Sequence, residues 1–145
     1  MGRAYSEELD RLQDTLAWAA GVGLPAMATV GVHPTNFALV VIGSGGSFTV
    51  ATALAANMSS LGQDFAQAMT PLQYVQCADS LPPHRVLLVS AEGKNRDILH
   101  ATRKALSAAA ACDVLTFSHT SPLAELVGVE PSARVFIFDP PWGRD

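Results

Sequence analysis

Short apolar runs alternate with amphipathic stretches from residue 37 to the end of the chain. Five runs of five or six residues end at Gly, Ser, Thr or a polar turn: 37–42, 64–69, 85–90, 113–117 and 134–138. Continuous apolar runs of this length are typical of parallel strands that helices cover on both faces. We therefore expect five strands, the second being the weakest because DFAQAM is partly polar.

The segments between these strands have helical periodicity. Residues 95–110 predict a clear helix capped by Asn95, and a short helix is expected from Pro71 to Cys77. Ser121 followed by Pro122 is typical of a helix start. The predicted buried faces are Ile98, Thr102, Ala105 and Ala109 in that helix, and Val50, Leu54, Met58 and Leu61 in a helix over 47–61.

An amphipathic helix is also predicted before the first strand. Residues 6–20 place Leu9, Leu12, Leu16 and Ala19 on one face, with Ser6 as the N-cap. The glycines and the proline that follow predict no regular structure over residues 21–36.

Strands that alternate with helices predict an α/β fold, a three-layer α-β-α sandwich with a five-stranded parallel sheet. We expect one domain over 1–145, with a helical lead-in at 1–36 and the α/β core at 37–145. No predicted helix follows the fifth strand, and an apolar edge strand invites aggregation. We therefore expect the domain to continue beyond this sequence, or another chain to cover the edge.

Composition and charge exclude several classes of protein. Hydrophobic residues make up 49% of the 145 residues, which argues against intrinsic disorder. The formal charge of -4, without a basic block, argues against a nucleic-acid partner. Glycines and a proline interrupt the most apolar stretch, 16–32, so a membrane span is not expected. Two cysteines exclude a disulfide scaffold and favour a reducing, cytoplasmic setting.

Two glycine-bearing loops follow the first and third strands. Residues 43–47 are GSGGS and residues 90–95 are SAEGKN. Glycine lets the main chain approach an anion, and a helix start offers unpaired N–H donors. If the strand order is 2-1-3-4-5, both loops open into one crevice at the switch point of the sheet. We predict an anion or phosphate site there. The alternative is a pair of ordinary turns, which favour the same residues.

These loops carry a resemblance to a known family. VVIGSGGSFTVATALA, followed by LLVSAEGKNRDILHATRKAL and then TFSHTSPLAEL, resembles the SIS (sugar isomerase) phosphosugar-binding domain from about residue 36 onward. The resemblance implies a flavodoxin-like sheet of order 2-1-3-4-5 and a phosphosugar or related carbohydrate derivative as ligand. It also implies a homodimer or pairing with a second SIS domain, and no cofactor.

The resemblance also assigns substrate-binding positions. They are Gly43, Ser44, Gly45, Gly46 and Ser47 in the first loop, Ser90, Glu92, Gly93 and Asn95 in the second, and Thr70 after the second strand. Two residues depart from the family pattern, since Gly46 replaces a Ser or Thr and Glu92 replaces a phosphate-binding serine. A carboxylate repels phosphate, so Glu92 must point away, pair with Lys94 or Arg96, or indicate a different ligand.

Isomerisation of a sugar phosphate also requires a base that moves a proton between carbons. The family takes it from a Gly-x-Glu turn after the fifth strand, and Asp145 stands at that position in Gly143-Arg144-Asp145. His119, just after the fourth strand, is the second catalytic candidate, with an ordinary polar loop residue as the alternative. The function is thus an aldose–ketose or aminosugar-phosphate enzyme, or a non-catalytic phosphosugar sensor.

A dinucleotide-binding domain and a metal site are less favoured. GSGGSF has Phe48 where the third glycine of the dinucleotide motif belongs, and Asp64 precedes the second strand instead of ending it. No two histidines have the spacing of metal ligands, and neither Cys77 nor Cys112 has a nearby partner. No helix-turn-helix pattern is evident in residues 1–36, which argues against a DNA-binding regulator within this chain.

Overall fold

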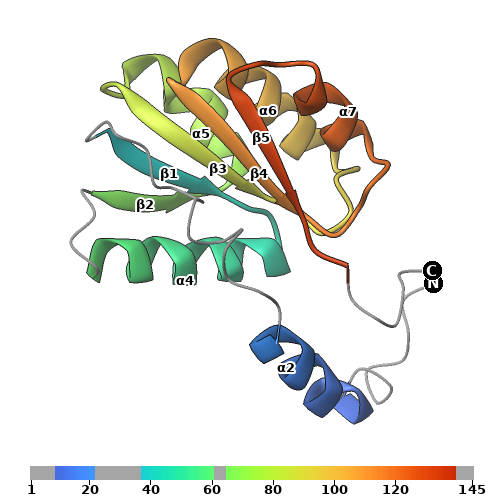
Figure 1. Cartoon of the computed structure of the whole chain (residues 1–145). Helices are drawn as coiled ribbons and strands as arrows, with labels where there is room; N and C mark the ends of the chain where they lie inside the picture. Colours follow the sequence, from blue (N-terminus) through green and yellow to red (C-terminus); the bar gives the residue numbers. More distant parts are fainter. Residues whose placement is uncertain (1–8, 22–36, 61–64, 140–145) are drawn as a thin grey trace.

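The structure of the chain is a computed structural model that describes residues 9–21, 37–60 and 65–139. Five strands alternate with helices in the order that the sequence predicts (Figure 1). The elements are α2 (Leu12–Gly21), β1 (Ala38–Ile42), α4 (Gly46–Ser60), β2 (Ala66–Met69), α5 (Pro71–Cys77), η1 (Ala78–Ser80), β3 (His84–Val89), α6 (Arg96–Ala108), β4 (Ala111–Thr116), α7 (Pro122–Gly128) and β5 (Ala133–Ile137).

The sheet confirms the predicted topology. Its strands are all parallel and follow the order β2-β1-β3-β4-β5. The first and third strands are therefore neighbours, and Ile42 lies beside Leu88 at the carboxyl end of their ladder. This pair of strands is the switch point at which open α/β sheets bind ligands.

Helices cover both faces of the sheet, which gives the expected three layers (Figure 1). On one face, α5, α6 and α7 pack against alternate strand residues such as Val86 and Leu88. On the other face, α4 packs against Leu87 and Val89. Burial on both faces explains why β3 is buried along its whole length and reads as a continuous apolar run.

The predicted buried face of α4 is wrong by one position. Val50 is 49% exposed, whereas Ala51 and Ala55 are buried and Leu54 is only half-buried. Alanines on the inner face let the helix lie close to the sheet, so the larger side chains are displaced to its flanks. Leu61 lies outside the described residues. The face predicted for α6 is correct, since Ile98, Thr102 and Ala105 are all buried.

The first helix does not bury the face that the sequence predicts. None of the residues of α2 is buried, and Leu12 and Leu16 are 50% and 62% exposed. The side of the helix that faces the body carries Trp18, whose ring centroid lies 6.3 Å from that of Phe117. The predicted N-cap Ser6 lies outside the described residues. No helix in the described part of the chain is long and apolar enough to cross a membrane.

Candidate functional site

The loop after β1 turns tightly into α4. A Cβ on Gly43 would lie 2.3 Å from the carbonyl oxygen of Ser47, so only glycine fits there. Gly45 adopts a left-handed conformation with φ 56°. The Ser47 N–H donates to the Ser44 carbonyl at 3.1 Å, and the Phe48 N–H donates to the Gly45 carbonyl at 3.0 Å. These bonds close the turn and leave the preceding amides at the start of the helix.

The loop after β3 is similar in construction. Gly93 is left-handed, with φ 64°, and its N–H donates to the Ser90 hydroxyl at 3.1 Å. The Asn95 side-chain oxygen caps α6 by accepting from the N–H groups of Asp97 and Ile98 at 2.8 and 3.3 Å. The amide oxygen of Asn95 is therefore engaged, whereas the Ser90 hydroxyl keeps a proton that it can donate.

The topology brings the two loops together. Because Ile42 pairs with Leu88 in a parallel ladder, the residues that follow each strand emerge side by side at one edge of the sheet. The helices that continue from the loops pack on opposite faces, α4 on one and α6 on the other (Figure 1). Two helix N-termini thus converge on the same edge from above and below the sheet.

The second loop is held in place by the neighbouring strand and helix. The Ala91 carbonyl accepts from the Phe117 N–H at 3.1 Å, and the Gly93 carbonyl accepts from the Leu123 N–H at 3.1 Å. A Cβ on Gly93 would lie 2.4 Å from the Ser121 hydroxyl oxygen. Ser121 is buried and caps α7 by accepting from the Ala124 N–H. The backbone of this loop is consequently preorganised.

Two predicted binding residues take positions that limit their role. The Thr70 hydroxyl accepts from the Gln73 N–H at 3.3 Å, and the Gln73 side chain accepts from the Thr70 N–H at 2.9 Å. This capping box starts α5 and occupies the polar groups of Thr70. Glu92 is exposed at the surface of its loop. Gly46 is also exposed and is the first residue of α4.

The structure gives His119 a partner that the sequence did not reveal. Its Nε2 lies 2.5 Å from the Asp139 Oδ1, and both side chains are exposed. Asp139 follows β5 just as His119 follows β4, so the pair lies at the same carboxyl edge as the loops. The strand boundaries alone could have placed both residues at this edge, but not in contact. Asp145, the other catalytic candidate, lies outside the described residues.

A second charged pair that the sequence analysis missed lies on the sheet itself. The Arg134 guanidinium donates to both carboxylate oxygens of Asp113, at 2.8 and 2.7 Å. The hydrogen bond to Asp113 raises the pKa of Arg134, whereas burial lowers the pKa of Arg85. This cluster is far from the carboxyl edge in the register of β3 to β5 and does not belong to the loops.

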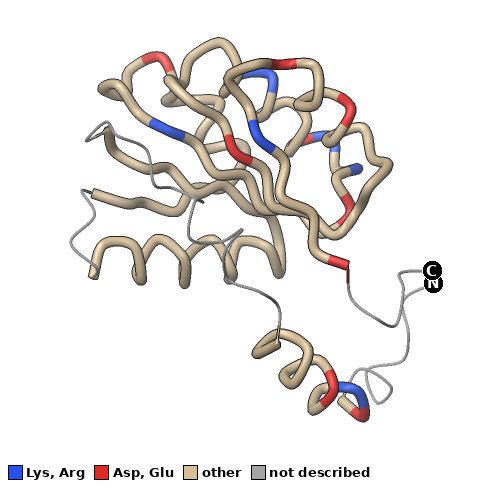
Figure 2. The backbone as a smooth tube through the Cα atoms, in the orientation of Figure 1, with Lys and Arg blue, Asp and Glu red and all other residues tan. Residues whose placement is uncertain are grey.

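Charges are unevenly distributed over the fold. The described parts of α4, β1 and β2 carry no Asp, Glu, Lys or Arg, so the first loop has no charged side chain nearby on its own elements (Figure 2). Within the described ranges, no three His, Cys, Asp or Glu side chains are grouped as metal ligands would be. Two hollows are found, of about 650 Å³ on α6 and about 300 Å³ between β2 and α5. Neither is lined by the residues of the two loops.

Comparison with known proteins gives structural but not sequence matches. No family model matches the chain, and no curated protein matches it. A candidate phosphosugar isomerase involved in capsule formation from Bacteroides fragilis matches with a TM-score of 0.66 at 22% identity, over 90% of this chain and 72% of that one. Vibrio vulnificus NanR, complexed with ManNAc-6P, matches with a TM-score of 0.67 at 25% identity, over 92% of this chain and 49% of NanR.

A further match is an Escherichia coli CFT073 protein in complex with a phosphosugar. It has a TM-score of 0.62 at 17% identity, over 85% of this chain and 71% of that one. The chain thus spans about half of NanR and about seven tenths of the other two. These matches confirm the resemblance to the SIS family at the level of the fold.

Proposed function

We propose that the chain binds a phosphosugar, with the phosphate held between the loops after β1 and β3. The observation that carries this proposal is the convergence of two left-handed glycines and two helix starts at the switch point of the sheet. Main-chain amides at such a position bind anions without a charged side chain. The support from relatives is that NanR was solved with ManNAc-6P and the Escherichia coli protein with a phosphosugar.

The chemistry of the loops fits a phosphate better than a neutral ligand. The amides of Ser44, Gly45 and Gly46 precede the first hydrogen bonds of α4 and can donate to phosphate oxygens. Ser47 and Ser90 add one hydroxyl donor each. Ser90 is nearly buried, and its acceptor side is already used by Gly93, so its hydroxyl proton is directed to an incoming acceptor.

The chain could act on this ligand or only sense it. An isomerase needs a group that moves a proton between carbons, and the exposed imidazole of His119 beside Asp139 is the described group at this edge that suits the task. A sensor needs only the loops. The similarity to NanR over 92% of the chain favours a sensor as the second candidate.

The proposal is tested by binding measurements on the whole chain. Calorimetry with a panel of sugar phosphates, the matching unphosphorylated sugars and NAD should give heat only with phosphorylated sugars. The double variant Ser47→Ala/Ser90→Ala should weaken binding by about tenfold or more, since each lost hydrogen bond to a charged group is worth about 1.5–3 kcal/mol.

Ser107→Ala is the matched control, because Ser107 is an exposed serine at the far end of α6 that bonds only to the Lys104 carbonyl. Equal affinities in the double variant and the control would contradict the proposed site. Binding of NAD alone would contradict the ligand class. Turnover of a bound sugar phosphate that disappears in His119→Gln, with affinity retained, would favour the enzyme over the sensor.

A further inference from the structure

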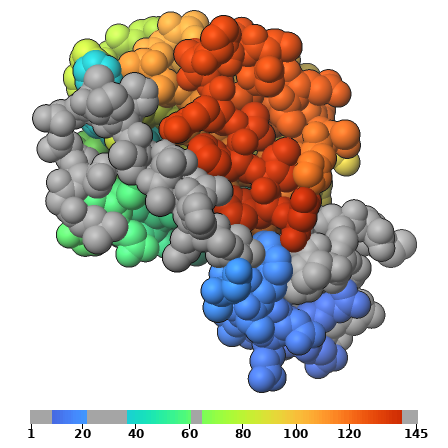
Figure 3. All heavy atoms as spheres, viewed as in Figure 1, coloured from blue at the N-terminus to red at the C-terminus, as the bar shows by residue number. Residues whose placement is uncertain are grey.

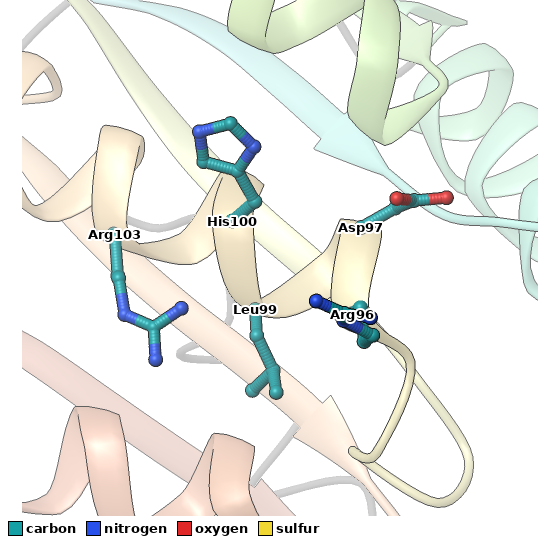
Figure 4. Close-up of a pocket in the computed structure, with 5 residues that line it drawn as sticks. All are labelled: Arg96, Asp97, Leu99, His100 and Arg103. Carbon is teal, nitrogen blue, oxygen red and sulfur yellow. The ribbon is translucent and has the colours of Figure 1, made fainter.

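The largest hollow of the described chain lies on the outer side of α6, away from the two loops. It has a volume of about 650 Å³ and is lined by Arg96, Asp97, Leu99, His100 and Arg103 (Figure 4). Arg96, His100 and Arg103 are spaced as one stripe of a helix, opposite the buried residues Ile98, Ala101 and Ala105. The proposed function leaves this hollow unused.

The hollow is also where positive charge gathers. Four of the nine Lys and Arg residues of the chain fall within residues 94–104. Lys104 donates to both oxygens of Asp79 at 2.7 and 2.6 Å and is thereby neutralised. Arg96 and Arg103 form no ion pair with any described residue. A basic stripe beside Leu99 suits a partner that is both acidic and apolar.

Helix α2 has those two properties. Leu9, Leu12 and Leu16 follow the i, i+3, i+7 pattern of one stripe and are 50%, 50% and 62% exposed. Asp10 and Asp14 lie next to that stripe. The space-filling view shows α2 standing out from the body at one end (Figure 3).

The leucine stripe faces away from the body of its own chain. Trp18, which contacts Phe117, lies on the opposite side of α2 from Leu9 and Leu16 in the helical period. Holding Trp18 against Phe117 therefore turns the leucines outward. An α2 in this position cannot place them in the hollow of its own α6, but a second copy of the chain can receive them.

We infer that α2 of one copy docks on the α6 hollow of a second copy. The leucines lie against Leu99, and Asp10 and Asp14 pair with Arg96 and Arg103. Because each copy has one such helix and one such hollow, two copies can exchange helices reciprocally in a closed dimer. This inference does not depend on the proposed ligand, and its test uses none.

Sedimentation of the whole chain and of two charge-reversed variants tests the exchange. The wild type should sediment as a dimer of twice 15.2 kDa. Asp10→Lys/Asp14→Lys and Arg96→Glu/Arg103→Glu should each be monomeric, because each places like charges in both contacts. An equimolar mixture of the two should again form a dimer, since both contacts in the mixed pair then join opposite charges.

Two controls keep the result interpretable. Glu125→Lys/Glu130→Lys reverses two exposed charges on and after α7 and should remain dimeric. Leu12→Ser/Leu16→Ser changes exposed side chains that no fold contact needs, so it should be folded by circular dichroism and monomeric. The inference is overturned by a monomeric wild type, by a charge-reversed variant that stays dimeric, or by a folded mixture that fails to associate. A monomeric wild type whose arginines bind inorganic phosphate would identify the hollow as an anion site instead.

Discussion

The two left-handed glycines of the candidate site offer a matched pair of substitutions. Gly45 and Gly93 have φ of 56° and 64°, so Gly45→Ala and Gly93→Ala impose the same conformational strain of about 1–2 kcal/mol. The stiffening of the unfolded chain, about 0.4–1 kcal/mol, is also common to both and cancels in their difference. What differs is the surroundings of the added methyl group.

At Gly45 a Cβ meets nothing within 4 Å, whereas at Gly93 it lies 2.4 Å from the Ser121 hydroxyl oxygen and 2.9 Å from the Ser121 Cβ. Ser121 is 1% exposed and cannot swing into solvent. To relieve the clash it must give up the cap of α7, which costs about 1 kcal/mol, or the loop must shift against packed neighbours, which costs about 1–3 kcal/mol. We therefore expect Gly93→Ala to be less stable than Gly45→Ala by about 2–3 kcal/mol.

Urea unfolding followed by circular dichroism measures this difference directly. Both variants should unfold with the slope of the wild type, so that the midpoints report stability alone. If the two variants have midpoints that agree within error, the loop after β3 is not clamped by α7, and the preorganisation argued for the candidate site is wrong.

Two further predictions concern the core behind the site. Tyr74→Phe should destabilise the protein by about 1–3 kcal/mol in urea unfolding, because the buried His84 Nε2, which accepts from the Tyr74 hydroxyl at 2.9 Å, then has no partner. An unchanged midpoint would show that water replaces the hydroxyl. Burial raises the pKa of the Cys112 thiol to about 12, so the thiol contributes stability that is fully present below about pH 8.5 and is lost as pH rises toward 12. Between pH 8 and 9.5 the wild type should lose about 1 kcal/mol of stability that Cys112→Ala does not lose. The native protein at pH 8.5 should also be alkylated at half-buried Cys77 before Cys112. A wild type and a Cys112→Ala variant with parallel pH profiles would contradict the raised pKa.

The strands were predictable because burial on both faces leaves a direct trace in the sequence. β3 is buried at all six positions and its sequence is apolar from Val86 to Val89. The strand order followed from the position of the two loops and the family resemblance, and the ladder between Ile42 and Leu88 confirms it. Helix starts at Asn95 and Ser121 were predictable because caps need particular side chains at particular positions.

The helix faces were harder to predict, because periodicity reports apolar residues and not what covers them. In α4 the inner residues are alanines, chosen for closeness to the sheet, and the larger Val50 is exposed. In α2 the periodic leucines are exposed, because the contact with the body runs through Trp18. The pairing of His119 with Asp139 was beyond sequence reasoning, since it joins residues that follow two different strands.

The capping bonds decide which parts of the edge can bind a ligand. Thr70 and Asn95 both spend their acceptor oxygens on helix starts, so they contribute less to a ligand than their residue types suggest. The polar groups that remain at the two loops are main-chain amides and the hydroxyls of Ser47 and Ser90. Amides read the charge and shape of a phosphate but not the identity of a sugar. In our proposal, affinity for phosphate therefore depends on the backbone of the two loops, and the choice of sugar depends on exposed side chains around them, with Glu92 and the His119–Asp139 pair foremost.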